Sequence, residues 1–192
     1  MSIQLKYKKL KYEIKYLTAE KEELVELLKE VLPKFETEFR KLVPEFENAN
    51  NKVKEENRKK SKQKIPNKKV TSEKDNSVKK VYRRIVTRTH PDKLEQLPNT
   101  QLKKGLIKKY KEAVHSYREN DLVSLFDLAD ELDIKLPEID ESHISMMTKQ
   151  INTLKNQVNA YQRSNALVWY NSEDREKTME SIIKQLKQAG RI

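Results

Sequence analysis

The chain has 192 residues, of which 35% are hydrophobic and 37% are charged, and its net charge is +11. Its two glycines and its lack of cysteine exclude glycine-rich phosphate loops, disulfides and thiolate metal sites. The strong Lys, Glu and Leu content with so little glycine predicts an all-α protein built from long helices.

Three histidines are present, His90, His115 and His143, and their spacing matches no metal-ligand pair, so we expect neither a metal nor another cofactor. The sequence contains no run of 18 apolar residues, and its first residues lack the apolar core of a signal peptide. We therefore expect a soluble protein of the cytoplasm or the nucleus that does not contact a membrane.

Residues 1–32 carry a heptad pattern that predicts a long coiled-coil helix. The partner of this helix stays open: a second copy in a homodimer, the chain's own C-terminal helix, or a foreign protein. One heptad position holds Ile3, Leu10, Leu17, Leu24 and Val31, and the other holds Tyr7, Ile14 and Leu28, with Lys21 interrupting the second series.

A short aromatic helix is expected after Pro33, because Phe35, Phe39, Leu42 and Val43 recur at helical spacing. The chain then becomes polar, and residues 52–69 hold nine Lys or Arg against two Glu. A basic segment can bind nucleic acid, but no aromatic side chains interleave with Arg58–Lys64 as a base-stacking surface requires. We interpret 48–69 as a solvated basic linker.

Thr71, Ser72 and Asp75 offer N-capping groups for a helix that runs towards His90. Its apolar positions recur at helical spacing and predict a face that packs on a core. These positions are Val78, Val81 or Tyr82, Ile85 and Thr89. The opposite face holds Lys79, Lys80, Arg83, Arg84, Thr87 and Arg88.

Pro91 disfavours a helical backbone at His90 and cannot continue the hydrogen-bond ladder, so the helix should stop there and present His90 and Asp92 on a turn. A polar loop follows, and a helix should resume before Tyr110 and run towards Tyr117. Asn120-Asp121 can then cap a further helix. The apolar face of that helix comprises Leu122, Leu125, Phe126, Ala129 and Leu132.

Residues 141–168 form a second heptad block in which Asn165 is expected as a polar core residue that fixes alignment. Ser172, Glu173 and Asp174 should start a final helix. The heptad positions are Ile144, Ile151 and Val158 with Met147, Leu154, Tyr161 and Val168, and the final helix carries Met179, Ile182, Ile183 and Leu186.

The segment VKKVYRRI, which leads to His90-Pro91-Asp92, resembles helix II and the HPD loop of the J domain, the module by which Hsp40 (DnaJ-type) co-chaperones engage Hsp70. The segment Lys109–Tyr117, KYKEAVHSY, resembles the family's helix III. Its matching packing positions are Tyr110, Ala113, Ser116 and Tyr117. The resemblance covers about residues 70–132.

This resemblance implies a non-catalytic protein that docks on ATP-bound Hsp70 and promotes ATP hydrolysis by that partner. Asp92 would then be the specific charged contact, with His90 and Pro91 holding its turn. Exposed cations would steer the encounter and form the rim of the contact: Lys79, Lys80, Arg83, Arg84, Arg88 and Lys93.

The sequence departs from the family at four points. Thr89 replaces an aromatic residue before HPD, the loop to helix III is longer, the helix I signature is missing, and neither a Gly/Phe-rich nor a cysteine-rich zinc module occurs. The chain would therefore be a protein with the J domain alone, and its coiled-coil arms would give client or partner specificity.

Since helix I is missing, another segment must cover the apolar faces of helices II and III. We expect the aromatic helix at 33–43 to do so, with the C-terminal helices as the alternative. The expected regions are 1–47 (coiled coil and aromatic helix), 48–69 (basic linker), 70–136 (J-like domain) and 137–192 (C-terminal helical and coiled-coil region). A different interpretation, a helical scaffold or nucleic-acid-associated protein that uses residues 52–69, remains open.

Overall fold

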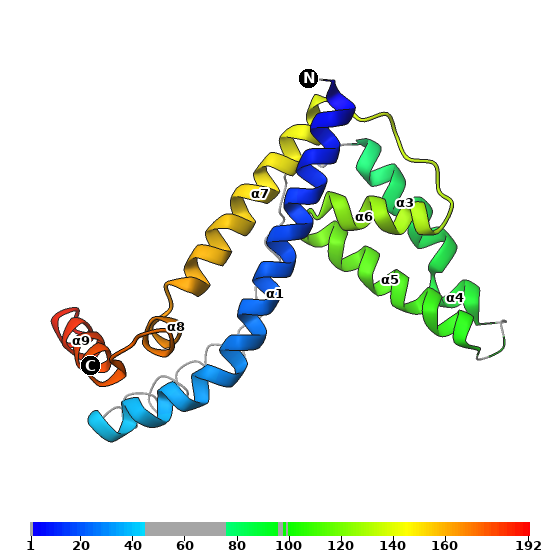
Figure 1. The fold of residues 1–192 in the computed structure, drawn as a ribbon. Helices are drawn as coiled ribbons and strands as arrows, with labels where there is room; N and C mark the ends of the chain where they lie inside the picture. Colours follow the sequence, from blue (N-terminus) through cyan, green and yellow to red (C-terminus); the bar gives the residue numbers. More distant parts are fainter. Residues whose placement is uncertain (1, 45–75, 96–97, 99) are drawn as a thin grey trace. The chain divides into compact units, whose positions relative to one another are not determined.

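The computed structural model describes residues 2–44, 76–95, 98 and 100–192. Every regular element in these ranges is a helix, which confirms the all-α expectation. No helix in these ranges has both the length and the apolar character needed to cross a bilayer. The helices are α1 (Ile3–Leu42), α3 (Asn76–Thr89), α4 (Pro91–Leu94), α5 (Gln101–Glu119), α6 (Leu122–Glu131), α7 (Glu141–Gln162), α8 (Asn165–Tyr170) and α9 (Arg175–Gln188) (Figure 1).

The described residues divide into two compact units. Unit 1 contains residues 2–18 and 76–155, and unit 2 contains residues 19–44 and 156–192. This division differs from the regions expected from the sequence, because α1 and α7 each supply side chains to both units. The expected basic linker, 48–69, lies outside the described residues.

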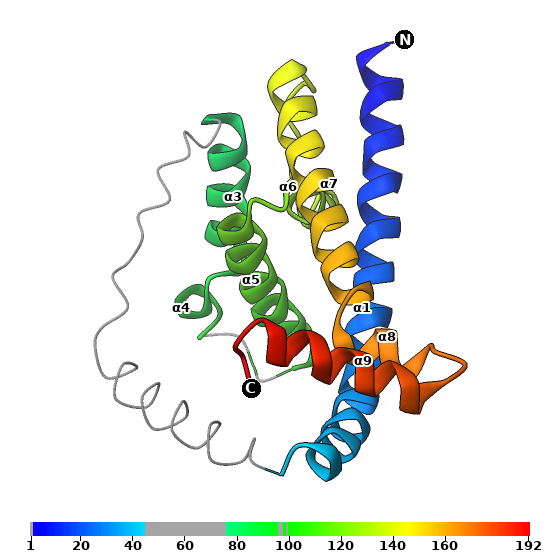
Figure 2. The same cartoon turned by 90° about the vertical axis from the view of Figure 1, so that its left-hand side faces the viewer.

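Unit 1 is built on an antiparallel hairpin of α3 and α5, with α4 at its turn (Figure 2). Ring contacts join Tyr82 to Tyr117 and His90 to Tyr110, so residue numbers rise along α3 as they fall along α5. Helix α6 packs against both. The hairpin and α6 share a core of Val78, Val81, Ile85, Ala113, Leu122, Val123, Leu125, Phe126, Leu128, Ala129 and Leu132.

Local signals define the ends of α5 and α6. The Thr100 side chain accepts a hydrogen bond from the Lys103 N–H at 3.4 Å, and Asn120 ends α5 in a left-handed conformation with φ 58°. Asp121 then caps α6 by accepting from the Ser124 N–H at 3.1 Å. The cap expected for α6 at Asn120-Asp121 is confirmed for Asp121, whereas Asn120 is the C-cap of α5.

Residues 7–17 of α1 and 146–154 of α7 cover the hairpin and α6. This cover corrects the expectation that residues 33–43 would replace helix I, because Phe35 and Phe39 lie in the core of unit 2 beside Trp169. The heptad face of α1 already offers a continuous apolar stripe, so no aromatic helix is needed. The covering side chains are Tyr7, Leu10, Ile14 and Leu17 of α1 and Met146, Met147, Ile151 and Leu154 of α7.

Helices α1 and α7 run side by side in the same direction (Figures 1 and 2). In unit 1, Lys155 Nζ lies 2.7 Å from Glu13 Oε1, and Lys6 Nζ lies 3.5 Å from Glu141 Oε2. In unit 2, Gln162 donates to Glu20 at 3.1 Å. Of the alternatives left open for the N-terminal heptads, the structure therefore shows the chain's own C-terminal helix beside them.

Unit 2 corrects the expected continuous heptad block over 141–168. Helix α7 ends at Gln162, and the Ser164 side chain accepts from the Leu167 N–H at 3.4 Å to start α8. Asn165 is exposed rather than a core residue, and Val168 is 45% exposed. The short helix instead directs Ala166, Leu167 and Trp169 into a core with Leu28, Val31, Phe39, Met179 and Ile182.

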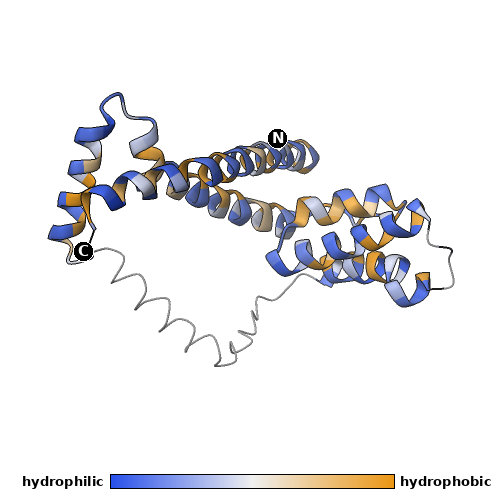
Figure 3. Cartoon of the chain, turned by 90° about the horizontal axis from the view of Figure 1, so that it is seen from below, coloured by the Kyte–Doolittle hydropathy of each residue, from blue (hydrophilic) through white to orange (hydrophobic). Residues whose placement is uncertain are grey.

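Along each helix, hydrophobic and hydrophilic residues alternate around the axis (Figure 3). The final helix begins where Asp174 accepts from the Lys177 N–H at 3.0 Å, as the sequence predicts. Its residues Met179 and Ile182 are buried, and Ile183 and Leu186 pack at the edge of the same core. Burial of one such side chain stabilises a fold by roughly 1.5–3 kcal/mol.

Candidate site at the HPD turn

Helix α3 presents the two faces that the sequence predicts. Val78, Val81, Ile85 and Thr89 are buried, with Ile85 and Thr89 at 0% exposure. The Thr89 hydroxyl donates to the Ile85 carbonyl at 2.8 Å, so this polar group is satisfied within the helix. Thr89 therefore fits in the core beside Ile85 with its hydroxyl satisfied within the helix.

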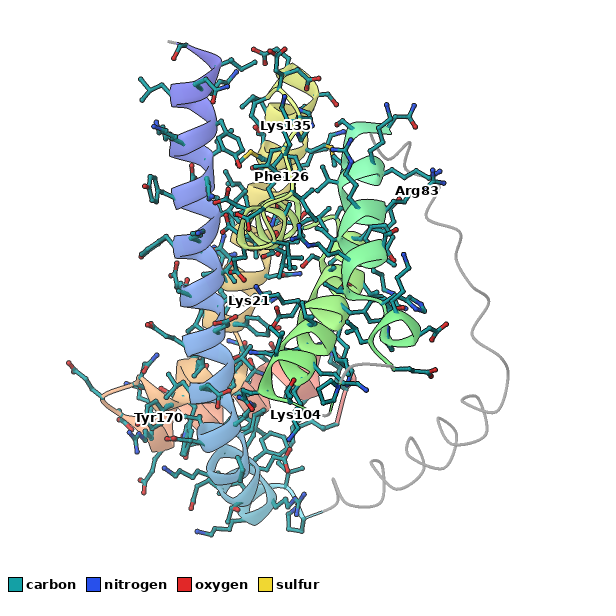
Figure 4. The ribbon with its side chains drawn as sticks, turned by 90° about the vertical axis from the view of Figure 1, so that its right-hand side faces the viewer. Lys21, Arg83, Lys104, Phe126, Lys135 and Tyr170 are labelled. Carbon is teal, nitrogen blue, oxygen red and sulfur yellow. The ribbon has the colours of Figure 1, made fainter. Side chains whose placement is uncertain are left out.

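The exposed face of α3 carries a cationic ridge, comprising Lys79, Lys80, Arg83, Arg84 and Arg88. The labelled Arg83 side chain points away from the helices, whereas Phe126 lies among them (Figure 4). A shallow hollow on the ridge is lined by Arg83, Arg84, Thr87 and Arg88. Because three of its four lining residues are arginines, the hollow favours anionic groups.

Helix α3 stops at Thr89, as the proline rule predicts. His90 is extended, with φ −61° and ψ 130°, and Pro91 is the first residue of the short helix α4. His90 Nδ1 accepts from the Asp92 N–H at 3.4 Å and so caps α4. The turn is therefore the first turn of a new helix, which Leu94 anchors at 4% exposure.

His90 and Asp92 have different surroundings. The His90 ring meets the Tyr110 ring edge to face, with centroids 5.3 Å apart at 83°. The Asp92 side chain is 80% exposed, and its Oδ1 lies 3.6 Å from His90 Nδ1. His90 holds the turn, and Asp92 presents a carboxylate to solvent beside the exposed Lys93.

Helices α3 and α5 pack closely on either side of this turn. Tyr82 and Tyr117 stack with centroids 3.9 Å apart at 6°, and burial, with the nearby Tyr110 and Tyr117 hydroxyls, raises the pKa of Tyr82. Ala113 is fully buried and Ser116 is 5% exposed, so small side chains let the helices approach. The four α5 positions expected to pack, Tyr110, Ala113, Ser116 and Tyr117, do so.

Two ridge arginines are already engaged within unit 1, which the sequence does not indicate. Arg88 Nη1 donates to the Leu132 carbonyl, and Arg84 Nη1 donates to the Lys135 carbonyl at 3.4 Å. Both carbonyls belong to the connector between α6 and α7, residues 132–140. Lys79, Lys80 and Arg83 make no hydrogen bond or ion pair with other described residues.

A buried histidine was also missed. His143 is 0% exposed, its Nε2 lies 2.8 Å from Ser77 Oγ, and its Nδ1 lies 2.7 Å from Asp140 Oδ1. This alignment of Ser, His and Asp resembles a catalytic triad, but its backbone bonds explain it otherwise. The His143 N–H donates to Asp140 Oδ1 at 3.0 Å and the Asp140 N–H donates to His143 Nδ1 at 3.2 Å, which is a reciprocal capping box.

The capping box starts α7, and the Ser77 contact ties it to the first turn of α3. A fully buried imidazole cannot meet a substrate, so this cluster is suited to holding two helix ends together.

Within the described ranges, no three His, Asp or Glu side chains gather as a metal site. No family model, curated protein or solved structure matches the chain.

Proposed function

We propose that this chain is a J-domain co-chaperone that docks on ATP-bound Hsp70 through the HPD turn and the basic face of α3, and stimulates ATP hydrolysis by that partner. The observation that carries the proposal is the division of roles at the turn. His90 packs on Tyr110, while Asp92 is 80% exposed at the end of a helical hairpin. The same hairpin also carries the exposed cations of α3.

The chemistry assigned to this chain is binding alone. The partner holds ATP and performs hydrolysis, so the chain itself needs no catalytic group and no cofactor. Exposed lysines and arginines raise association rates with an acidic surface, and the Asp92 carboxylate can accept a charge-assisted hydrogen bond at the centre of the contact. The long helices outside the hairpin would give client or partner specificity. The protein would act in the cytoplasm or the nucleus, where it meets an Hsp70.

Single-turnover ATPase measurements on an Hsp70 test this proposal. The wild-type chain should accelerate hydrolysis, and His90→Gln should remove the acceleration because the turn loses its ring contact with Tyr110. His115→Gln is a matched control, since His115 is exposed on α5 of the same hairpin. Equal stimulation by wild type and His90→Gln, with unchanged helical circular dichroism, would show that the HPD turn is incidental.

A further inference from the structure

One edge of α3 is covered by the connector, residues 132–140. Arg88 contacts the Leu132 carbonyl, Arg84 contacts the Lys135 carbonyl, and Ser77 contacts His143 just beyond the connector. Positions 77, 84 and 88 are spaced by seven and four residues, so they form a single line along the helix. The connector therefore runs antiparallel to α3 along this line.

The start of the connector is fixed by the end of α6. Asp133 adopts φ 51°, the Ile134 N–H donates to the Ala129 carbonyl at 2.8 Å, and the Asp133 N–H donates to the Asp130 carbonyl at 3.0 Å. This is a Schellman motif, which turns the chain back at a helix end. Ile134, Leu136 and Ile139 then pack against the core of unit 1.

The arginine contacts complete this arrangement. The last carbonyls of a helix have no partner within the helix, and Arg88 supplies one for Leu132, the C-cap residue of α6. Arg84 and Arg88 are exposed like the other ridge cations, but each also donates a hydrogen bond to a carbonyl of the connector. Arg84 and Arg88 thus differ from the other ridge cations in what they contact, although all five look alike in the sequence.

The opposite edge of α3 faces α5 through Tyr82. On a helix that turns by roughly 100° per residue, the arc between the two edges holds Lys79, Lys80, Arg83 and Thr87. These four side chains are exposed. They form a cationic row bounded by α5 on one side and by the connector on the other.

We infer that the partner's acidic surface binds this row, Lys79, Lys80 and Arg83, and that Arg84 and Arg88 are positioning residues. The two arginines hold the connector along α3 and so fix the N-terminus of α7 beside the first turn of the hairpin. This inference rests on the proposed function for its partner. The connector contacts themselves are independent of any partner.

The test compares two double variants of the full chain that each remove two positive charges: Lys80→Ala with Arg83→Ala, and Arg84→Ala with Arg88→Ala. Amide hydrogen exchange of residues 132–140 is measured without a partner, and association with ATP-loaded Hsp70 is measured at several salt concentrations. Loss of row charges should slow association by about tenfold and flatten its salt dependence. Amide hydrogen exchange of the connector should not change in this row variant.

Loss of Arg84 and Arg88 should give the opposite pattern. Connector exchange should rise by about tenfold, while association slows by less than about threefold and stays salt-dependent. A second variant, Arg88→Lys, retains the charge and should raise connector exchange without slowing association. This variant keeps the test valid if the double alanine variant unfolds.

Two results would overturn the inference. If Arg84→Ala with Arg88→Ala slows association as strongly as Lys80→Ala with Arg83→Ala, and connector exchange is unchanged, the two arginines are docking groups. Unchanged connector exchange in Arg88→Lys would remove the positioning role. Absence of any Hsp70 binding by the wild-type chain would instead refute the proposed function, and the exchange data would still decide whether the arginines hold the connector.

Discussion

Asp92 and His90 are separated by one residue but contribute to different properties. The His90 ring is part of the packing between α4 and α5, whereas the Asp92 carboxylate is exposed and, among the described residues, pairs with the His90 ring at 3.6 Å. A surface side chain with so few contacts changes stability by no more than about 0.5 kcal/mol when it is replaced. Binding and stability can therefore be separated at this turn.

We expect Asp92→Asn to reduce Hsp70 stimulation by at least about tenfold, since a lost charge-assisted hydrogen bond costs about 1.5–3 kcal/mol. The free energy of unfolding should stay within about 0.5 kcal/mol of the wild type. Single-turnover ATPase and urea unfolding measure the two quantities. Glu119→Gln, which removes an exposed carboxylate at the other end of α5, should change neither. A stable Asp92→Asn variant that stimulates fully would exclude the docking role of this carboxylate.

At the level of elements, one carboxylate joins α1 to α6. Asp127 of α6 pairs with Lys11 and, at 2.7 Å, with Lys15. Burial alone would raise the pKa of Asp127, but hydrogen bonds and charge from both lysines outweigh it and lower this pKa. Burial and the Asp127 charge together raise the pKa of Tyr7 on the same face of α1.

This pairing predicts a pH-dependent contribution to stability. Because the pKa of Asp127 is lower in the folded state, its contribution is present above the unfolded value of about 3.9 and is lost as pH falls through the folded value. Asp127→Asn should therefore lower the free energy of unfolding by about 1 kcal/mol at pH 7. Urea unfolding of the wild type and of Asp127→Asn at a pH well below about 3.9 should show a much smaller difference. A difference that is equal at both pH values would point to lost packing instead.

Helix α3 could be predicted from the sequence, and its connector contacts could not. Apolar spacing and Pro91 define the buried face and the end of α3, because both depend on nearby residues. Arg84 and Arg88 bind carbonyls 51 and 44 residues away, and backbone carbonyls leave no pattern in a sequence. His143 was likewise missed because its partner Ser77 is 66 residues away.

The expectation of a continuous heptad block over 141–168 was wrong for a local reason. The spacing continues through Val168, but Ser164 caps a new helix and interrupts the register. A serine within a helical pattern can be either an exposed helix residue or a cap, and only the following backbone distinguishes them. The same limit applies to Phe35 and Phe39, whose pattern predicts burial but does not identify Trp169 as their partner.

At the scale of the whole molecule, the two units have separate cores, and no buried side chain of the described residues belongs to both. Every residue proposed to contact Hsp70 belongs to unit 1. Ile14 and Phe39 lie on the same helix, α1, at 2% and 4% exposure, but Ile14 is in the unit 1 core and Phe39 is in the unit 2 core. Truncation at these two positions therefore probes each core through one helix.

Phe39→Ala should weaken the unit 2 core by about 3–5 kcal/mol, and Ile14→Ala should weaken the unit 1 core by about 2–5 kcal/mol. We expect Phe39→Ala to raise hydrogen exchange in residues 19–44 and 156–192 while Hsp70 stimulation is retained. Ile14→Ala should raise exchange in α3, α5 and α6 and reduce stimulation, because α1 covers the hairpin that carries His90 and Asp92. Hydrogen exchange and stimulation of both variants are measured below the midpoint of thermal unfolding, so that global unfolding does not contribute. Equal loss of stimulation in the two variants would mean that the cores are coupled and that unit 2 supports the docking hairpin.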